Sequence, residues 1–129
     1  MRSSFAKWVL TGILLVSALA GGNAIARDRS SAYAIDQVAL SQLPLQARST
    51  HQLILQGGPF PFEKDGMVFG NRERLLPLQP RGFYREYTVS APGSHARGVK
   101  RIICGGPATR PEACFYTADH YASFRKIEP

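Results

Sequence analysis

Turn-forming sequences divide the second half of the chain into short apolar segments, and this spacing restricts the folds that the chain can adopt. The segments are rich in β-branched and aromatic residues and span residues 67–69, 83–90, 100–104 and 115–117. We expect each of them to be a β-strand. Gly and Pro lie between them, as in Ala91-Pro92-Gly93 and Gly105-Gly106-Pro107. Because the intervals are too short for crossover helices, consecutive strands should pair in antiparallel fashion.

One strong helix signal precedes these segments. Residues 45–56 follow Pro44 directly and end before Gly57-Gly58, and helices favour Pro at their start and Gly just past their end. Ala47, Ile54 and Leu55 fall near one face, which the helix should bury against a sheet. The order of elements therefore predicts an α+β fold, with one main N-terminal α-helix packed on a twisted antiparallel β-sheet.

Residues 1–26 have the pattern of a secretory signal peptide. Arg2 and Lys7 come first, the apolar run 8–20 follows, and small residues lead up to Ala26. The run is shorter than the roughly 20 apolar residues of an ordinary membrane span. We therefore expect export to the periplasm or the extracellular space, with a retained membrane anchor as the alternative.

Cleavage after Ala26 would leave residues 27–129, which are enough for one compact domain and too few for two. Residues 27–42 begin with a polar, Ser-rich stretch that has no strong periodicity, and we expect them to form a loose N-terminal arm. The folded domain should then comprise residues 43–129.

The charge distribution indicates an anionic partner. The chain has a formal net charge of +7 and remains basic without Arg2 and Lys7. Between residues 72 and 101 the only acidic residues are Glu73 and Glu86, whereas the cations are Arg72, Arg74, Arg81, Arg85, Arg97, Lys100 and Arg101. Nucleic acid fits this pattern. An anionic membrane surface fits less well, because the basic stretch lacks the period of an amphipathic helix.

The chain contains two cysteines, Cys104 and Cys114, with a Gly- and Pro-rich segment between them. In an exported protein such a pair is expected to form a disulfide across a hairpin loop. Closing so short a loop would contribute about 2–3 kcal/mol in the chain-entropy model. Two thiols without a matching group of histidines do not predict a zinc site.

Four residues of this basic region and the segment after it supply the groups that metal-free RNA cleavage requires. A carboxylate such as Glu86 can take the proton from a ribose 2′-hydroxyl, and an imidazolium such as His120 can protonate the departing 5′-oxygen. Arg97 and Arg101 can stabilise the charge on the phosphate between them. Alternation along the strands places Glu86 and Arg101 on faces that can meet.

Ordered motifs across residues 43–127 resemble those of the secreted microbial guanyl-specific ribonucleases, the barnase and ribonuclease Sa group. The motifs are Gly58-Pro59-Phe60-Pro61-Phe62, Asp65-Gly66-Met67-Val68-Phe69, Asn71-Arg72-Glu73, Tyr84-Arg85-Glu86-Tyr87-Thr88-Val89, Arg97-Gly98, Arg101-Ile102-Ile103 and Tyr116-Thr117-Ala118-Asp119-His120-Tyr121. Their shared order is far more specific than any single motif.

The resemblance implies a reaction and a role for each catalytic residue. Glu86 would be the general base, His120 the general acid, and Arg97 and Arg101 the phosphate-binding arginines. Single-stranded RNA would be cleaved by transphosphorylation to a guanosine 2′,3′-cyclic phosphate, which is slowly hydrolysed to the 3′-phosphate. No metal or other cofactor is required in the family.

The resemblance also implies a guanine site. Glu73 would accept hydrogen bonds from guanine N1 and the exocyclic amine, while backbone amides around Asn71 and Arg72 would donate to O6. Phe69 and Tyr121 would flank or support the nucleotide, and Met67 is the remaining candidate for substrate contact. Adenine has no N1 proton, so it would leave Glu73 unpaired, at a cost of about 1.5–3 kcal/mol for a buried charged hydrogen bond.

Two features depart from the family pattern. Gly70 stands where relatives carry a longer polar side chain, so the recognition loop should lack one contact. Cys104 and Cys114 are also placed differently from the end-to-end disulfide of ribonuclease Sa. Neither departure affects the four catalytic positions.

Each candidate catalytic residue could have a simpler role when it is considered alone. Glu86 could be a surface carboxylate that Arg97 and Arg101 merely neutralise. His51 and His95 compete with His120 for any proton-transfer role, and His95 lies beside Arg97. Two other functions fit the same chain: a non-catalytic, basic RNA-binding protein, or an intercellular ribonuclease toxin with a barstar-like inhibitor. The expected state is a monomer with single-stranded RNA as its partner.

Overall fold

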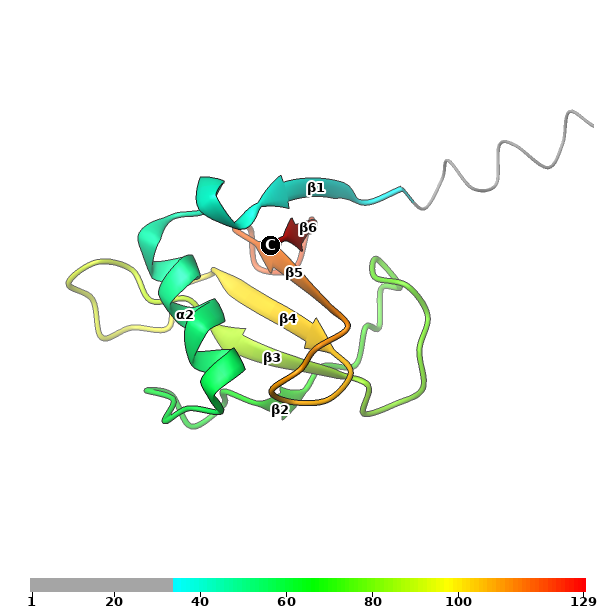
Figure 1. The fold of residues 1–129 in the computed structure, drawn as a ribbon, viewed down its shortest axis with the longest axis horizontal. Helices are drawn as coiled ribbons and strands as arrows, with labels where there is room; N and C mark the ends of the chain where they lie inside the picture. The colour runs from blue at the N-terminus through cyan, green and yellow to red at the C-terminus, as the bar shows by residue number, and fades with distance from the viewer. Residues whose placement is uncertain (1–33) are drawn as a thin grey trace, which may run out of the picture.

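The computed structural model describes residues 34–129, so the predicted signal peptide lies outside the described part. The elements are β1 (Asp36–Ala39), η1 (Leu40–Gln42), α2 (Leu45–Gln56), β2 (Met67–Val68), β3 (Tyr84–Thr88), β4 (Arg101–Gly105), β5 (Ala113–Thr117) and β6 (Arg125–Glu128). The strands form one six-stranded sheet in the order β1-β6-β5-β4-β3-β2 (Figure 1). Only the β1–β6 pair is parallel. The predicted α+β fold is confirmed.

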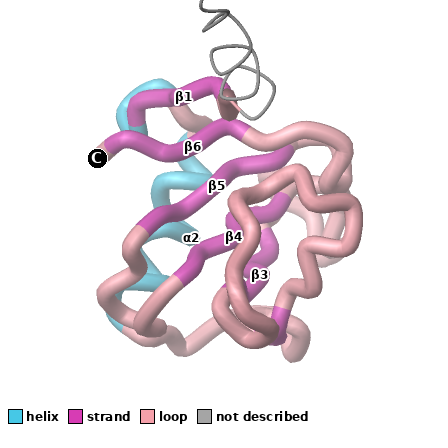
Figure 2. Tube along the Cα trace, turned by 90° about the vertical axis from the view of Figure 1, so that its right-hand side faces the viewer, coloured by secondary structure: helices cyan, strands magenta, loops and turns pink. Residues whose placement is uncertain are grey.

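Helix α2 covers one face of the sheet, as Figures 1 and 2 show from two directions. It begins and ends at the predicted residues, and Gly57 closes it in the left-handed conformation, with φ 82°. Ala47 and Ile54 are buried between the helix and the sheet. Leu55, which we expected on the same face, is instead 47% exposed. The buried stripe is therefore narrower than the sequence suggested.

The register of the central strands places the cysteines on the face of the sheet that packs against α2 and the charged candidate residues on the opposite face. Cys104 lies directly opposite Cys114, and the predicted disulfide joins them. Both cysteines pack with Ile102 and Tyr116 in the core beneath α2. Because side chains alternate along a strand, Ile103 and its neighbours on the same face point away from the helix. The disulfide thus stabilises the sheet without entering the face that carries the charged residues.

The expectation of a loose N-terminal arm is wrong for the part of residues 27–42 that the structure describes. Residues 36–39 form β1, which pairs in parallel with β6, and residues 40–42 form the 3₁₀ turn η1. Val38 anchors β1 in the core and lies opposite Ile127 of β6. Hydrogen bonding to a strand far along the chain, with one buried residue in each strand, orders this segment.

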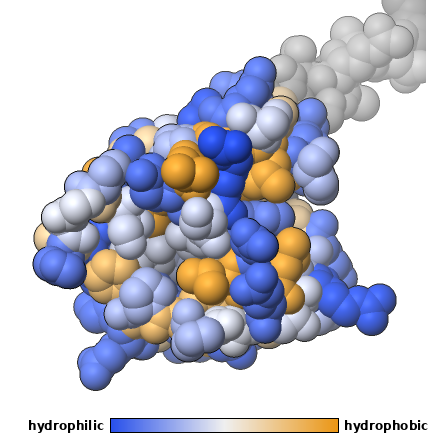
Figure 3. All heavy atoms as spheres, turned by 60° about the vertical axis from the view of Figure 1, so that its left-hand side comes forward, coloured by the Kyte–Doolittle hydropathy of each residue, from blue (hydrophilic) through white to orange (hydrophobic). Residues whose placement is uncertain are grey.

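The surface of the described part shows no large apolar region in the view of Figure 3, where hydrophobic side chains lie in separate patches among hydrophilic ones. Within residues 34–129, no helix has the length and apolar character that crossing a membrane would require. Exposed large apolar residues include Leu45 and Leu78.

Candidate active site

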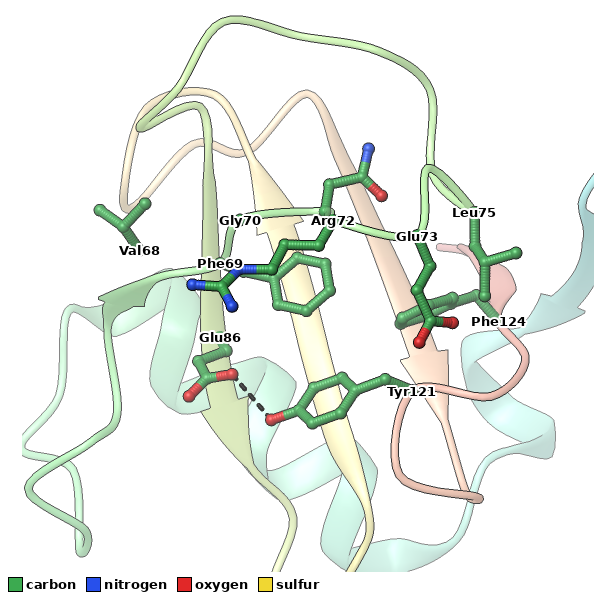
Figure 4. A pocket seen from close by; sticks show the side chains of 10 residues that line it. Val68, Phe69, Gly70, Arg72, Glu73, Leu75, Glu86, Tyr121 and Phe124 are labelled. Carbon is green, nitrogen blue, oxygen red and sulfur yellow. Dashed lines mark hydrogen bonds between the residues drawn. The ribbon is translucent and has the colours of Figure 1, made fainter.

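A pocket of about 300 Å³ opens on the face of the sheet opposite α2 (Figure 4). Strand β3 supplies Glu86, the segment after β2 supplies most of one wall, and the loop between β5 and β6 supplies the other. The lining residues are Val68, Phe69, Gly70, Asn71, Arg72, Glu73, Leu75, Glu86, Tyr121 and Phe124. The pocket therefore contains Glu86 together with most of the predicted guanine site.

Tyr121 fixes the position of Glu86 within this pocket. Its hydroxyl donates a 2.7 Å hydrogen bond to Glu86 Oε2 (Figure 4), and its ring stacks on Phe69 with the ring centres 5.4 Å apart. Burial, followed by the hydrogen bond to Glu86, raises the pKa of the Tyr121 phenol above its ordinary 10.0. The hydroxyl thus remains a proton donor to Glu86 Oε2. The other carboxylate oxygen, Oε1, accepts no hydrogen bond within the described residues.

Arg97 approaches Glu86 from the loop between β3 and β4. Its Nη2 lies 3.8 Å from Glu86 Oε1, and its Nε donates to Thr88 Oγ1 at 3.1 Å. The same Nη2 is buried and has no hydrogen-bond partner within the described chain. Buried donors are normally satisfied. An anion beside Glu86 would satisfy this one.

Arg101 is the largest fully buried side chain, only 2% exposed. Its Nη1 donates to the backbone oxygens of Lys100 (2.8 Å) and Arg97 (3.3 Å), while its Nε has no partner among residues 34–129. No carboxylate of the described part lies within 4.0 Å of its guanidinium. A buried cation without a counter-ion is costly, and an anion bound beside Arg101 would offset this cost.

The predicted geometry of Glu86 and Arg101 holds only in part. Both residues lie on the same face, as expected, but Arg101 is directly opposite Thr88, and Glu86 is opposite Ile103. The ion pair of Glu86 is with Arg97 from the loop. Arg101 instead lies near Tyr121, with its guanidinium carbon 6.0 Å from the ring centre.

His120 lies at the outer edge of this group and is exposed. Its ring centre is 4.8 Å from that of Tyr121, and its backbone N–H donates to Val99 O at 3.1 Å. Tyr121 therefore contacts His120 with its ring and Glu86 with its hydroxyl. His120 does not line the pocket itself. It therefore lies outside the expected guanine site and next to the loop between β3 and β4, which carries Arg97.

The segment from Asn71 to Leu76 forms the wall expected to recognise guanine. The Asn71 side chain donates to Leu76 O (3.0 Å) and accepts from Leu76 N (3.1 Å), which closes the loop around Glu73. In Figure 4 the Arg72 side chain runs past Gly70 toward Glu86. A Cβ at Gly70 would lie 3.6 Å from Arg72 Cγ, in ordinary van der Waals contact, so a side chain there would pack against Arg72.

Some predicted residues lie away from the pocket. Met67 pairs with Glu86 across β2 and β3 but is 53% exposed and outside the lining. His51 lies on α2, on the other side of the sheet, where burial lowers its pKa below 6.5. His95 is exposed in the loop that carries Arg97. Among residues 34–129, no group of three or more His, Cys, Asp or Glu residues could hold a metal ion.

Comparison with known proteins identifies the family. A family model described as ribonuclease matches residues 27–128. The chain belongs to the ribonuclease family. This ribonuclease is 52% identical over 91 residues to guanyl-specific ribonuclease Sa of Kitasatospora aureofaciens, a match that covers 70% of the chain and 92% of the relative. It is also 47% identical over 90 residues to guanyl-specific ribonuclease St of Saccharopolyspora erythraea, covering 70% and 85% of the two proteins.

Solved structures agree with this assignment. The ribonuclease is similar to ribonuclease Sa2 in complex with mononucleotides, with a TM-score of 0.68 and 43% identity over 74% of this chain and 96% of that one. Ribonuclease Sa2 has also been solved with guanosine-2′-cyclophosphate, at a TM-score of 0.67 and 42% identity, over 74% of this chain and 98% of that one. The family resemblance is therefore confirmed.

The pocket of this ribonuclease also contains residues that the sequence argument did not select. Phe124 packs against Phe69 in a T-shaped arrangement, with the ring centres 6.1 Å apart, and forms one wall with Leu75. Val68 lines the opposite side. Phe124 lies only three positions after Tyr121, but nothing in its local pattern distinguishes a pocket aromatic from a core aromatic.

Proposed function

We propose that the protein is a guanine-preferring endoribonuclease that cleaves single-stranded RNA by metal-free transphosphorylation. The observation that carries this proposal is the arrangement around Tyr121: Glu86 on its hydroxyl, His120 against its ring and Arg101 nearby. Tyr121 thus neighbours a carboxylate, an imidazole and a guanidinium, and Arg97 Nη2 and Arg101 Nε have no hydrogen-bond partner among residues 34–129. The relatives named guanyl-specific and the nucleotide complexes of ribonuclease Sa2 support the same reaction.

In the first step, ionised Glu86 takes the proton from the 2′-hydroxyl, and the 2′-oxygen attacks phosphorus. The bond from phosphorus to the 5′-oxygen breaks, and protonated His120 supplies a proton to that oxygen. The donors of Arg97 and Arg101 stabilise the added negative charge on the phosphate. Water then opens the cyclic product, with His120 as base and Glu86 as acid, to give the 3′-phosphate. DNA lacks the 2′-hydroxyl and cannot react in this way.

Glu73 carries the proposed preference for guanine. It lines the pocket on the wall that Asn71 closes, where its carboxylate can accept hydrogen bonds from guanine N1–H and the exocyclic amine. We expect Glu73→Gln to lower kcat/KM for GpN dinucleotides about 10- to 100-fold, because one charge-assisted hydrogen bond is worth about 1.5–3 kcal/mol. Cleavage of ApN dinucleotides should change far less. Steady-state kinetics on both series measures the difference, and equal losses would remove Glu73 from base recognition.

The reaction itself is tested by incubating the purified protein with RNA in the presence of EDTA. We expect short fragments that end in guanosine 2′,3′-cyclic phosphate and, after longer times, in guanosine 3′-phosphate. Mass spectrometry of the fragment ends distinguishes these products. Intact RNA, protected from other nucleases by the protein, would instead indicate a non-catalytic RNA-binding protein.

The proposed setting is outside the cytoplasm, with the protein acting as a monomer on RNA. The family match begins at residue 27, directly after the predicted cleavage site, which supports removal of residues 1–26 on export. The exposed cations around the pocket, such as Arg72 and Arg74, would attract RNA and would equally suit a small acidic inhibitor protein of the barstar type. Binding to RNA should weaken as the salt concentration rises.

A further inference from the structure

The turn that carries His120 has an unusual backbone. His120 and Tyr121 are consecutive residues with positive φ, 53° and 72°, and neither is Gly. Side chains with a Cβ are disfavoured in this region, so two in succession persist only where the surrounding structure enforces them. The conformation presents the His120 ring on one side of Tyr121 while the Tyr121 hydroxyl reaches Glu86.

Asp119 supplies the hydrogen bonds that enforce this turn. Its Oδ1 accepts from Thr117 Oγ1 (2.8 Å) and from the Ser123 backbone N–H (2.9 Å), and its Oδ2 accepts from Ser123 Oγ (2.6 Å). Thr117 Oγ1 in turn accepts from the Tyr121 backbone N–H at 3.1 Å. The carboxylate therefore ties the residues on both sides of His120 to each other and to β5.

Thr117 provides the fixed end of this network. It is the last residue of β5 and is 1% exposed, whereas Asp119, His120 and Ser123 are all exposed. Asp119 belongs to no ion pair within the described chain, so its bonds act on the turn rather than on a cation. These bonds, led by the one from the Ser123 hydroxyl, hold the pKa of Asp119 below its ordinary value.

We propose that Asp119 is a positioning residue: its carboxylate holds the turn 119–123 in the conformation that places the His120 imidazole beside the leaving 5′-oxygen. The Tyr121 side chain is held separately, by Glu86 and by stacking on Phe69. Loss of Asp119 should therefore displace the acid and leave the base in place. This inference rests on the proposed role of His120 as general acid.

The test compares two substrates that differ in their need for an acid. The dinucleotide GpU has a poor leaving group, whereas guanosine 3′-(4-nitrophenyl phosphate) releases a phenolate that needs no proton. We expect Asp119→Ala to lower kcat for GpU about 10- to 100-fold, as misplacement of a catalytic group does, with KM little changed. The nitrophenyl substrate should lose only a small part of its rate.

Two further variants separate geometry from charge. Asp119→Asn retains an acceptor for Thr117 and the Ser123 N–H and should recover much of the activity that Asp119→Ala loses. Glu63→Gln is the control for removing one exposed negative charge, because Glu63 takes part in no described hydrogen bond or ion pair. Its kinetics should match those of the unchanged protein. Thermal unfolding of each variant shows whether the fold persists.

The outcomes distinguish this inference from the function on which it rests. Suppose that His120→Gln lowers kcat for GpU but not for the nitrophenyl substrate. If Asp119→Ala then lowers kcat for both substrates equally, or for neither, the positioning role is wrong. If His120→Gln itself lowers kcat for both substrates equally, the assignment of His120 as the general acid is wrong instead. A selective loss on GpU in both variants, with partial recovery in Asp119→Asn, supports the inference.

Discussion

Replacing Glu86 with Gln is expected to lower kcat for GpU cyclisation by about 10²- to 10⁴-fold, the usual contribution of a general base. Gln has nearly the same shape and can still accept the hydrogen bond from Tyr121, which is 2.7 Å long in the structure. It cannot take a proton from the 2′-hydroxyl. The effect should therefore appear in kcat, with KM for GpU and the fold largely retained. Steady-state kinetics and thermal unfolding measure the two quantities.

The chain offers a matched control for this variant. Glu128 forms an ion pair with Lys126 at 3.8 Å, the same separation as between Glu86 and Arg97, but it lies on β6, away from the pocket. Glu128→Gln removes an equivalent charge and should leave kcat nearly unchanged. The rate of the unchanged protein should also rise with pH as Glu86 ionises, and Glu86→Gln should abolish that rise. An active Glu86→Gln variant with a normal pH profile would rule out the proposed base.

Local signals explain why the helix was predictable to the residue. Pro44 begins α2, and Gly57, in the left-handed conformation, ends it. The central strands are bounded in the same way by Gly and Pro turns. Strands β1 and β6 were missed because they are polar, with Val38 and Ile127 as their only fully buried residues. These two strands form because β1 pairs with β6 and β6 pairs with β5. Local sequence patterns do not reveal such long-range pairing.

The sequence selected the polar residues that line the candidate pocket, but it did not select Val68, Leu75 and Phe124, and it did not predict the geometry. Strand alternation correctly placed Glu86 and Arg101 on one face. The partner of Glu86 depends on register and on how a loop folds back, and the structure places Arg97 there instead. The proposed role of Asp119 was also missed, because its hydrogen bonds to Thr117 and Ser123 form only in the folded turn, whose positive φ angles at His120 and Tyr121 no side-chain pattern encodes.

Replacing His120 with Gln should cause the second large loss, again about 10²- to 10⁴-fold in kcat for GpU. Its ring lies against Tyr121 but makes no side-chain hydrogen bond within the described residues, so the substitution removes the acid without breaking a hydrogen bond. The decline in rate at high pH, where the imidazolium loses its proton, should disappear in this variant.

His95 provides the control for this prediction, because it is the other exposed histidine near the arginine loop. His95→Gln makes the same chemical change a short distance from Arg97 and should leave both kcat and the alkaline decline in place. If His95→Gln were the damaging variant, the proton would reach the 5′-oxygen from the loop between β3 and β4. The turn that Asp119 holds would then have no role in the reaction. The two histidine variants, measured over the same pH range, therefore decide which side of the phosphate carries the acid.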